Sequence, residues 1–128
     1  MILYFAADLV WASKIKATAN ALGLAARPVR TLEMLEARLA DADPVAVLLD
    51  LDSPDIALAM LARLRDPSRP TQRRIKVLAW GPHIARDLLQ KARDLGADDV
   101  LTRGAFDHAM EDILPRLASA APDRPGHA

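Results

Sequence analysis

Short apolar runs alternate with longer amphipathic stretches five times along this chain. The apolar runs predict strands, and they lie at residues 2–7, 26–30, 45–50, 75–79 and 100–102. The stretches that follow them place apolar residues at helical spacing and predict helices at residues 9–22, 32–39, 55–64, 83–95 and 107–117. A regular alternation of strand and helix is typical of an α/β domain built around a parallel sheet.

Two features of these runs predict how the strands are arranged. Pro28 interrupts the second run, and because proline cannot donate to a strand ladder, this strand should lie at a sheet edge. Residues 45–49 are consecutively apolar and predict a strand that is buried on both faces. With right-handed crossovers, this favours the strand order 2-1-3-4-5. We therefore predict a three-layer α/β sandwich with a doubly wound, five-stranded parallel sheet over residues 1–118, followed by a disordered tail at 119–128.

Local signals also predict where individual helices begin and end. Thr31 is placed to cap the second helix and Asp55 to cap the third, in which Ile56 should face inward. Gly23 and Gly96 are placed to end the first and fourth helices, because glycine readily adopts the left-handed conformation that helix ends need.

Composition excludes several classes of protein. Although 52% of the 128 residues are hydrophobic, no apolar run approaches the roughly 20 residues that span a bilayer. The apolar start runs into Asp8 without a basic leader, which predicts a strand rather than a signal peptide. The absence of cysteine excludes disulfides and thiolate metal sites, and makes the cytoplasm the default location. Seventeen basic and seventeen acidic residues balance, which argues against nonspecific binding to nucleic acid.

Charged residues follow the ends of three predicted strands. Asp8 follows the first strand, Asp50 ends the third and Arg103 follows the fifth. The strand order reverses between the first and third strands, so Asp8 and Asp50 should meet at the crevice where such sheets bind ligands. With Asp52 they could form a Mg²⁺ site, although each could instead cap the helix that follows. Arg103 adds a permanent positive charge that could pair with Asp50 or bind phosphate.

Two segments resemble the receiver domains of two-component response regulators. They are residues 45–55 (VAVLLDLDSPD) and 95–104 (LGADDVLTRG), and the resemblance extends over about residues 1–117. It implies a flavodoxin-like fold and a role in phosphorelay signalling. In that family an aspartate ending the third strand accepts a phosphoryl group from a histidine kinase, and a proline follows four residues later. Asp50 and Pro54 match that spacing, which implies that Asp50 is the acceptor and that Asp8, Asp50 and the main-chain carbonyl of Asp52 hold Mg²⁺.

Three positions depart from the family pattern. Ala7 stands where the family has a second acidic residue, Gly81 where a threonine or serine hydroxyl ends the fourth strand, and Arg103-Gly104 where a lysine precedes a proline. One carboxylate fewer leaves only a weak Mg²⁺ site, and arginine keeps the charge of lysine with a different geometry. Without the hydroxyl, a phosphoryl group on Asp50 has one hydrogen-bond donor fewer. The hydroxyl movement that couples phosphorylation to the output face is also absent. We therefore predict a stand-alone divergent receiver or pseudo-receiver, not an enzyme, that contacts a histidine kinase or a downstream effector.

A second hypothesis is an adaptor that binds a fixed protein partner without phosphorylation. The segment from Trp80 to His83 is predicted to be an exposed loop in which the tryptophan could anchor a partner, although Trp80 could instead cover the crevice. Receivers also dimerise or engage effectors through the face formed here by residues 83–95, 100–102 and 107–117. Its mixed charges suit a reversible contact, including a homodimer.

A small metal-dependent phosphatase could use Asp50 as nucleophile and Asp52 as acid, but such enzymes need more acidic ligands than this chain offers. Trp11 is expected to pack rather than to shield the site. A basic cluster should form a solvated surface or, alternatively, a surface for an acidic partner; its members are Arg63, Arg65, Arg69, Arg73, Arg74 and Lys76.

Overall fold

The computed structural model describes residues 1–119, and these fold around one parallel sheet with the strand order β2-β1-β3-β4-β5. The strands are β1 (Ile2–Phe5), β2 (Ala26–Pro28), β3 (Ala46–Asp50), β4 (Lys76–Gly81) and β5 (Asp99–Thr102). The predicted fold class and strand order are thus confirmed, including the edge position of the strand that contains Pro28. The predicted tail lies outside the described residues, except for Ser119, which ends the last helix.

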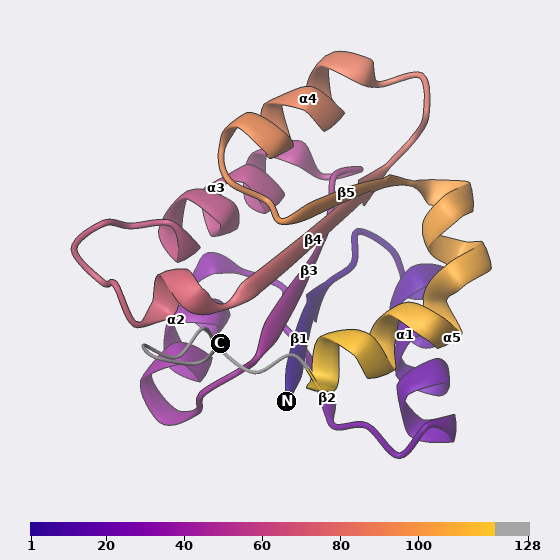
Figure 1. Cartoon of the computed structure of the whole chain (residues 1–128), viewed down its shortest axis with the longest axis horizontal. Coiled ribbons are helices and arrows are strands. Elements are labelled where there is room, and N and C mark those ends of the chain that lie inside the picture. The colour runs from indigo at the N-terminus through magenta and orange to yellow at the C-terminus, as the bar shows by residue number, and fades with distance from the viewer. Residues whose placement is uncertain (120–128) are drawn as a thin grey trace, which may run out of the picture.

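Helices cover both faces of the sheet. They are α1 (Leu9–Ala21), α2 (Leu32–Asp41), α3 (Pro54–Leu64), α4 (Arg86–Asp94) and α5 (Arg103–Ser119), with a short 3₁₀ turn, η1 (Gln72–Arg74), before β4. Figure 1 shows α1 and α5 on one side of the sheet and α2, α3 and α4 on the other. None of the helices in residues 1–119 is long and apolar enough to cross a membrane.

Alternate residues of each strand enter two separate cores. In β3, Val47 and Leu49 pack with α2, α3 and α4, whereas Ala46 and Leu48 pack with α1 and α5. All four side chains are fully buried, as predicted for a strand covered on both faces. The next position in this alternation is Asp50, whose carboxylate therefore faces the α1 and α5 side at the carboxyl end of the sheet.

The helix ends confirm most of the local signals. Thr31 caps α2 by accepting a hydrogen bond from the Met34 N–H (3.1 Å). Gly23 and Gly96, with φ of 70° and 107°, follow the ends of α1 and α4 in the left-handed conformation.

Helix α3 begins differently from the prediction. It starts at Pro54, one residue before the predicted cap Asp55, because proline has a preset φ and no N–H to satisfy at the first position of a helix. Ile56, predicted to face inward, is exposed. The buried stripe is centred on Ala57, Met60 and Leu64, and Ile56 lies at its margin.

Three further boundaries near the site differ from the prediction. Strand β4 continues to Gly81, two residues beyond the predicted end, so Trp80 lies in the sheet rather than in a loop. Helix α4 begins at Arg86 rather than at His83, and α5 begins at Arg103 rather than at residue 107. Arg103 therefore lies at the start of a helix and directly after β5.

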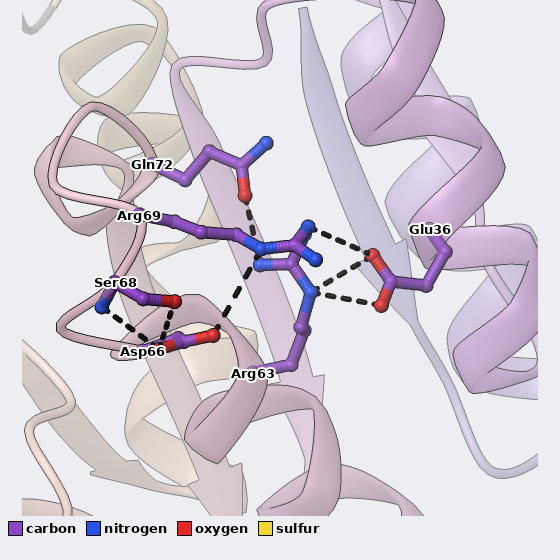
Figure 2. A network of polar contacts seen from close by, with 6 residues as sticks. All are labelled: Glu36, Arg63, Asp66, Ser68, Arg69 and Gln72. Atoms are coloured by element: carbon purple, nitrogen blue, oxygen red, sulfur yellow. Dashed lines mark hydrogen bonds and ion pairs between the residues drawn. The ribbon is translucent and has the colours of Figure 1, made fainter.

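The basic cluster is partly folded into the molecule, so the prediction of a solvated surface is wrong for two of its members. The Arg63 side chain is only 10% exposed. Its Nε donates to both carboxylate oxygens of Glu36 (2.8 and 2.9 Å), and its Nη1 donates to Gln72 (2.8 Å; Figure 2). Since Glu36 belongs to α2, this contact joins α2 to α3.

Arg65 is the second inward member of the cluster. Its Nε donates to the main-chain carbonyl of Gly96 (2.9 Å), its Nη1 to that of Ile75 (3.0 Å), and its Nη2 to Asp98 (2.9 Å). Asp98 also accepts the N–H of Val77 (2.8 Å). One side chain thus holds the end of α3, the start of β4 and the turn before β5 together.

Candidate functional site

Asp50 is the most deeply buried charged residue within residues 1–119, with 1% of its surface exposed. It is the last residue of β3 and pairs in register with Trp80 of β4. The neighbouring strand on the other side is β1, so Asp50 lies where the strand order reverses. In open α/β sheets this is the place where ligands bind.

The Asp50 carboxylate joins two loops through the main chain. Its Oδ2 accepts the N–H of Ala7 (2.8 Å), which follows β1, and its Oδ1 accepts the N–H of Asp52 (3.0 Å), which follows β3. Ala7 stands where the receiver pattern has an acidic side chain, and here it contributes only its main-chain N–H. The sequence did not reveal this role, because any residue except proline supplies a main-chain donor.

The surroundings of Asp50 oppose its ionisation. Burial raises the pKa of the Asp50 carboxyl above its ordinary value of 3.8. The hydrogen bonds from Ala7 and Asp52 lower this pKa, whereas the negative charges of Asp52 and Asp8 raise it further. Burial is the largest of these effects, so the pKa of Asp50 is raised overall. A cation nearby would relieve this unfavourable charge.

Asp8 performs the helix-capping role that the sequence analysis kept as an alternative. Its Oδ1 accepts the N–H of Trp11 (2.9 Å) at the start of α1, and its side chain is exposed. Within residues 1–119, its Oδ2 has no hydrogen-bond partner. Capping therefore leaves one carboxylate oxygen of Asp8 for another ligand.

Arg103 pairs with Asp52 and not with Asp50. Its Nη2 lies 2.9 Å from Asp52 Oδ1, and both side chains are about half exposed. The hydrogen bonds of the Asp50 carboxylate come instead from the main chain. An exposed ion pair contributes little to stability, so Arg103 can exchange Asp52 for another anion at low cost.

Gly81, at the end of β4, is closely packed. A Cβ atom built on it would lie 3.2 Å from Leu51 Cβ and 3.4 Å from Leu89 Cδ2. The buried Leu51 side chain, directly after Asp50, thus occupies space that a side chain at position 81 would need. Leu51 and Leu89 therefore pack around position 81, where the receiver pattern has a hydroxyl residue.

The prediction that Trp80 lies in an exposed loop is wrong. Trp80 is fully buried, with its ring centroid 4.6 Å from that of Phe106 and 5.7 Å from that of Trp11. Because β4 extends through Gly81, the Trp80 side chain faces α1 and α5 rather than solvent. Its Nε1 is buried and has no hydrogen-bond partner in the part of the chain that the structure describes. Trp11 also stacks on Phe106 (5.7 Å), which confirms that it packs.

Metal binding would have to rely on few ligands. No group of three or more histidine, cysteine, aspartate or glutamate side chains within residues 1–119 could hold a metal ion. The side chain of Asp52 is paired with Arg103, which leaves Asp8, Asp50 and main-chain carbonyls as donors at this edge. Two carboxylates with water are sufficient for Mg²⁺, which retains several waters in proteins.

The most exposed large apolar residues lie in the segments after β1 and β4. Leu9 and Val10 begin α1 and are 76% and 72% exposed, and Ile84, between β4 and α4, is 80% exposed. These segments follow the carboxyl ends of their strands, at the edge of the sheet where Asp50 lies. An exposed apolar group next to a polar site often marks a contact with another molecule.

Comparisons with known proteins support the fold. No family model matches the chain, and no curated protein matches it. The signal receiver domain of a signal transduction histidine kinase from Syntrophus aciditrophicus is similar in structure, with a TM-score of 0.79 and 20% identity over 99% of this chain and 96% of that chain. The receiver domain of NtrX from Brucella abortus matches with a TM-score of 0.77 and 16% identity, over 94% of this chain and 100% of that chain.

A third similar structure is the phosphorylated cyanobacterial phytochrome response regulator RcpA. It matches with a TM-score of 0.75 and 22% identity, over 94% of each chain. Together these likenesses establish the fold. The chain has the flavodoxin-like fold of response-regulator receiver domains over nearly its whole length.

Proposed function

We propose that this chain is a receiver-like signalling module in which Asp50 accepts a phosphoryl group. The observation that carries the proposal is a buried carboxylate, with a raised pKa, at the carboxyl end of β3 in a receiver fold. Perturbed carboxyl groups at such an edge are often functional. The module would act in the cytoplasm through contacts with a protein partner, which would be a histidine kinase or a downstream effector.

The contacts of Asp50 are compatible with this chemistry. Each of its oxygens accepts one main-chain N–H, and since a carboxylate oxygen carries two lone pairs, each retains one. An oxygen of ionised Asp50 would bond to the phosphorus of the donor as the bond to the leaving group breaks; for a phosphohistidine donor, the imidazole nitrogen departs with the electron pair and takes up a proton. Asp8, Asp50 and the main-chain carbonyl of Asp52 would hold Mg²⁺, which neutralises charge on the phosphoryl oxygens. Arg103 would leave Asp52 and pair with the phosphoryl group.

The site is partly degenerate in this proposal. Gly81 supplies no hydroxyl, and Leu51 packs where a side chain at position 81 would lie. A phosphoryl group on Asp50 would instead disturb the N–H contacts of Ala7 and Asp52, and so move the loops after β1 and β3. These loops lead to α1 and α3, which makes them the route by which a partner would sense phosphorylation.

Tryptophan fluorescence with Mg²⁺ and beryllofluoride, a mimic of the aspartyl phosphate, tests the proposal. Trp80 pairs in register with Asp50 and contacts Trp11, so a change at the carboxylate should alter the emission. We expect a saturable change with both reagents in the wild type and in the control Asp112→Asn, which alters an exposed aspartate of α5. Asp50→Asn should abolish the change. An equal response in Asp50→Asn, or none in the wild type, would contradict the proposal.

The exposed apolar residues favour a second candidate, an adaptor that works without phosphorylation. Trp80 cannot anchor a partner because it is buried, but Leu9, Val10 and Ile84 are exposed at the same edge. The face formed by α4, β5 and α5 also carries a hollow of about 280 Å³ between β5 and α5, whose lining includes Leu101, Ala109 and Ile113. This face would suit a second copy of the chain or an effector.

Paired variants separate the two candidates. If the chain is an adaptor that works without phosphorylation, the double variant Leu9→Ser with Ile84→Ser should no longer bind the partner proteins that the wild type captures. Asp50→Asn should still bind them. Sedimentation of Ile113→Asp would test the homodimer.

The phosphatase hypothesis is weakened by the pairing of Asp52 with Arg103, and repeated turnover of para-nitrophenyl phosphate would restore it.

A further inference from the structure

A hollow of about 360 Å³ lies at the edge of the sheet opposite Asp50. It is formed where α2 ends, β3 begins and η1 leads into β4. Its lining comprises Leu39, Ala42, Asp43, Pro44, Val45, Thr71, Gln72, Arg74, Ile75 and Lys76. Sites for small molecules have volumes of roughly 300–1,000 Å³, so this hollow is large enough for a small ligand.

One part of the lining is apolar and another is positively charged. Leu39, Pro44 and Ile75 contribute apolar surface. Arg74 and Lys76 contribute two positive charges, and neither has an ion-pair partner within residues 1–119, in contrast to Arg63, Arg65 and Arg69 of the same cluster. Asp43 is the single acidic residue of the lining. The balance of charge therefore favours an anion.

Gln72 adds a neutral donor to this lining. Its Oε1 accepts from Arg63 Nη1 (2.8 Å), and because a guanidinium can only donate, the oxygen of the amide must face Arg63. The Nε2 group is then turned away from the network, as Figure 2 shows, and makes no hydrogen bond within the described residues. The Gln72 amide group is therefore free to donate to a ligand in the hollow that Gln72 lines.

We propose that this hollow binds a small organic anion with an apolar body, such as an acyl or aryl carboxylate. The carboxylate would accept from Arg74, Lys76 and the Gln72 amide, and the apolar body would pack on Leu39, Pro44 and Ile75. A ligand of this kind supplies both the acceptors and the apolar surface that the lining requires. The hollow and Asp50 lie at opposite ends of β3 and β4, so binding here can be measured separately from any phosphorylation of Asp50.

An NMR titration of the ¹⁵N-labelled chain with octanoate tests the proposal, with octanol as a probe that has the same chain and no charge. We expect saturable shifts confined to the amides of residues 39–45 and 71–76, and binding of octanol at least tenfold weaker. The double variant Arg74→Ala with Lys76→Ala should weaken octanoate about tenfold and leave octanol unchanged. Arg73→Ala, which alters the exposed arginine next to the hollow, should have no effect.

Asp43→Asn provides a test of opposite sign. Removal of the single carboxylate from the lining should tighten octanoate binding severalfold, because the repulsion between like charges is lost. The proposal is overturned if octanoate causes no saturable shifts, if its shifts lie elsewhere, or if octanoate and octanol bind equally in all variants.

Discussion

Asp50 combines full burial with main-chain hydrogen bonds to both of its oxygens. Such bonds favour the ionised form, whereas burial opposes it, and burial is the larger effect. The folded state therefore holds the proton of Asp50 more tightly than the unfolded chain does. The residue that carries the proposed function thus destabilises the fold when it is ionised.

The first prediction concerns the pH dependence of stability. Below pH 3.8 the carboxyl is protonated in both states, and between 3.8 and its raised pKa only the folded state keeps the proton. The free energy of unfolding of the wild type, relative to that of Asp50→Asn, should therefore fall as the pH rises through this interval and then level off. Urea unfolding of both proteins across this range measures the difference. A difference that rises with pH would mean that the pKa is lowered.

At the scale of elements, the contact between β4 and the turn after β3 decides what position 81 can hold. The atom nearest to a Cβ on Gly81 is Leu51 Cβ, which is attached directly to the main chain and cannot rotate away. Gly104, the second residue of α5, has no atom within 4 Å of the corresponding Cβ position. Neither glycine has a positive φ, so backbone strain does not bar alanine at either position, and the two differ in the space around the Cβ and in lying in a strand and a helix.

The second prediction follows from this pair of glycines. Gly81→Ala should lower the free energy of unfolding by about 1 kcal/mol, because overpacking outweighs the loss of unfolded-state entropy. Gly104→Ala should raise it by about 0.5–1 kcal/mol, because an open helix position gains from alanine. Denaturant midpoints of the two variants compare the effects directly. Equal stabilisation by both would show that Leu51 moves aside and that a hydroxyl could be restored at position 81.

For the molecule as a whole, two arginines of the basic cluster hold separate elements together. Arg63 joins α2 to α3 through Glu36, and Arg65 joins the end of α3 to carbonyls before β4 and after α4. Both side chains are largely buried, and the contacts of Arg65 span more than thirty residues of sequence. A buried hydrogen bond from a charged donor is costly to break, because its acceptor is then left buried without a donor.

The third prediction compares Arg65 with Arg73. Arg65→Ala should lower the free energy of unfolding by about 3 kcal/mol, since three main-chain carbonyls lose their Arg65 donor and Asp98 loses its positively charged partner. Arg73→Ala, at an exposed position of the same cluster, should change it by less than about 0.5 kcal/mol. Chemical unfolding measures both. Similar effects of the two substitutions would show that the cluster acts as a solvated surface after all.

The sequence by itself determined the fold class, the strand order and the residues at the carboxyl edge of the sheet. These follow from patterns that are local in the chain, such as Pro28 in an edge strand, the apolar run before Asp50, and Gly23 and Gly96 after their helices. Main-chain preferences and the burial of an apolar run depend on near neighbours, so they can be predicted without a partner in space.

The tertiary structure alone decided which groups meet at that edge. Trp80 is buried because β4 runs two residues further and α5 brings Phe106 against it, and Asp50 binds Ala7, which lies 43 positions away. Arg103 pairs with Asp52, 51 positions away in the chain, and not with Asp50. These contacts depend on distances between segments far apart in the chain, and their energies are small individually, so no local pattern encodes them.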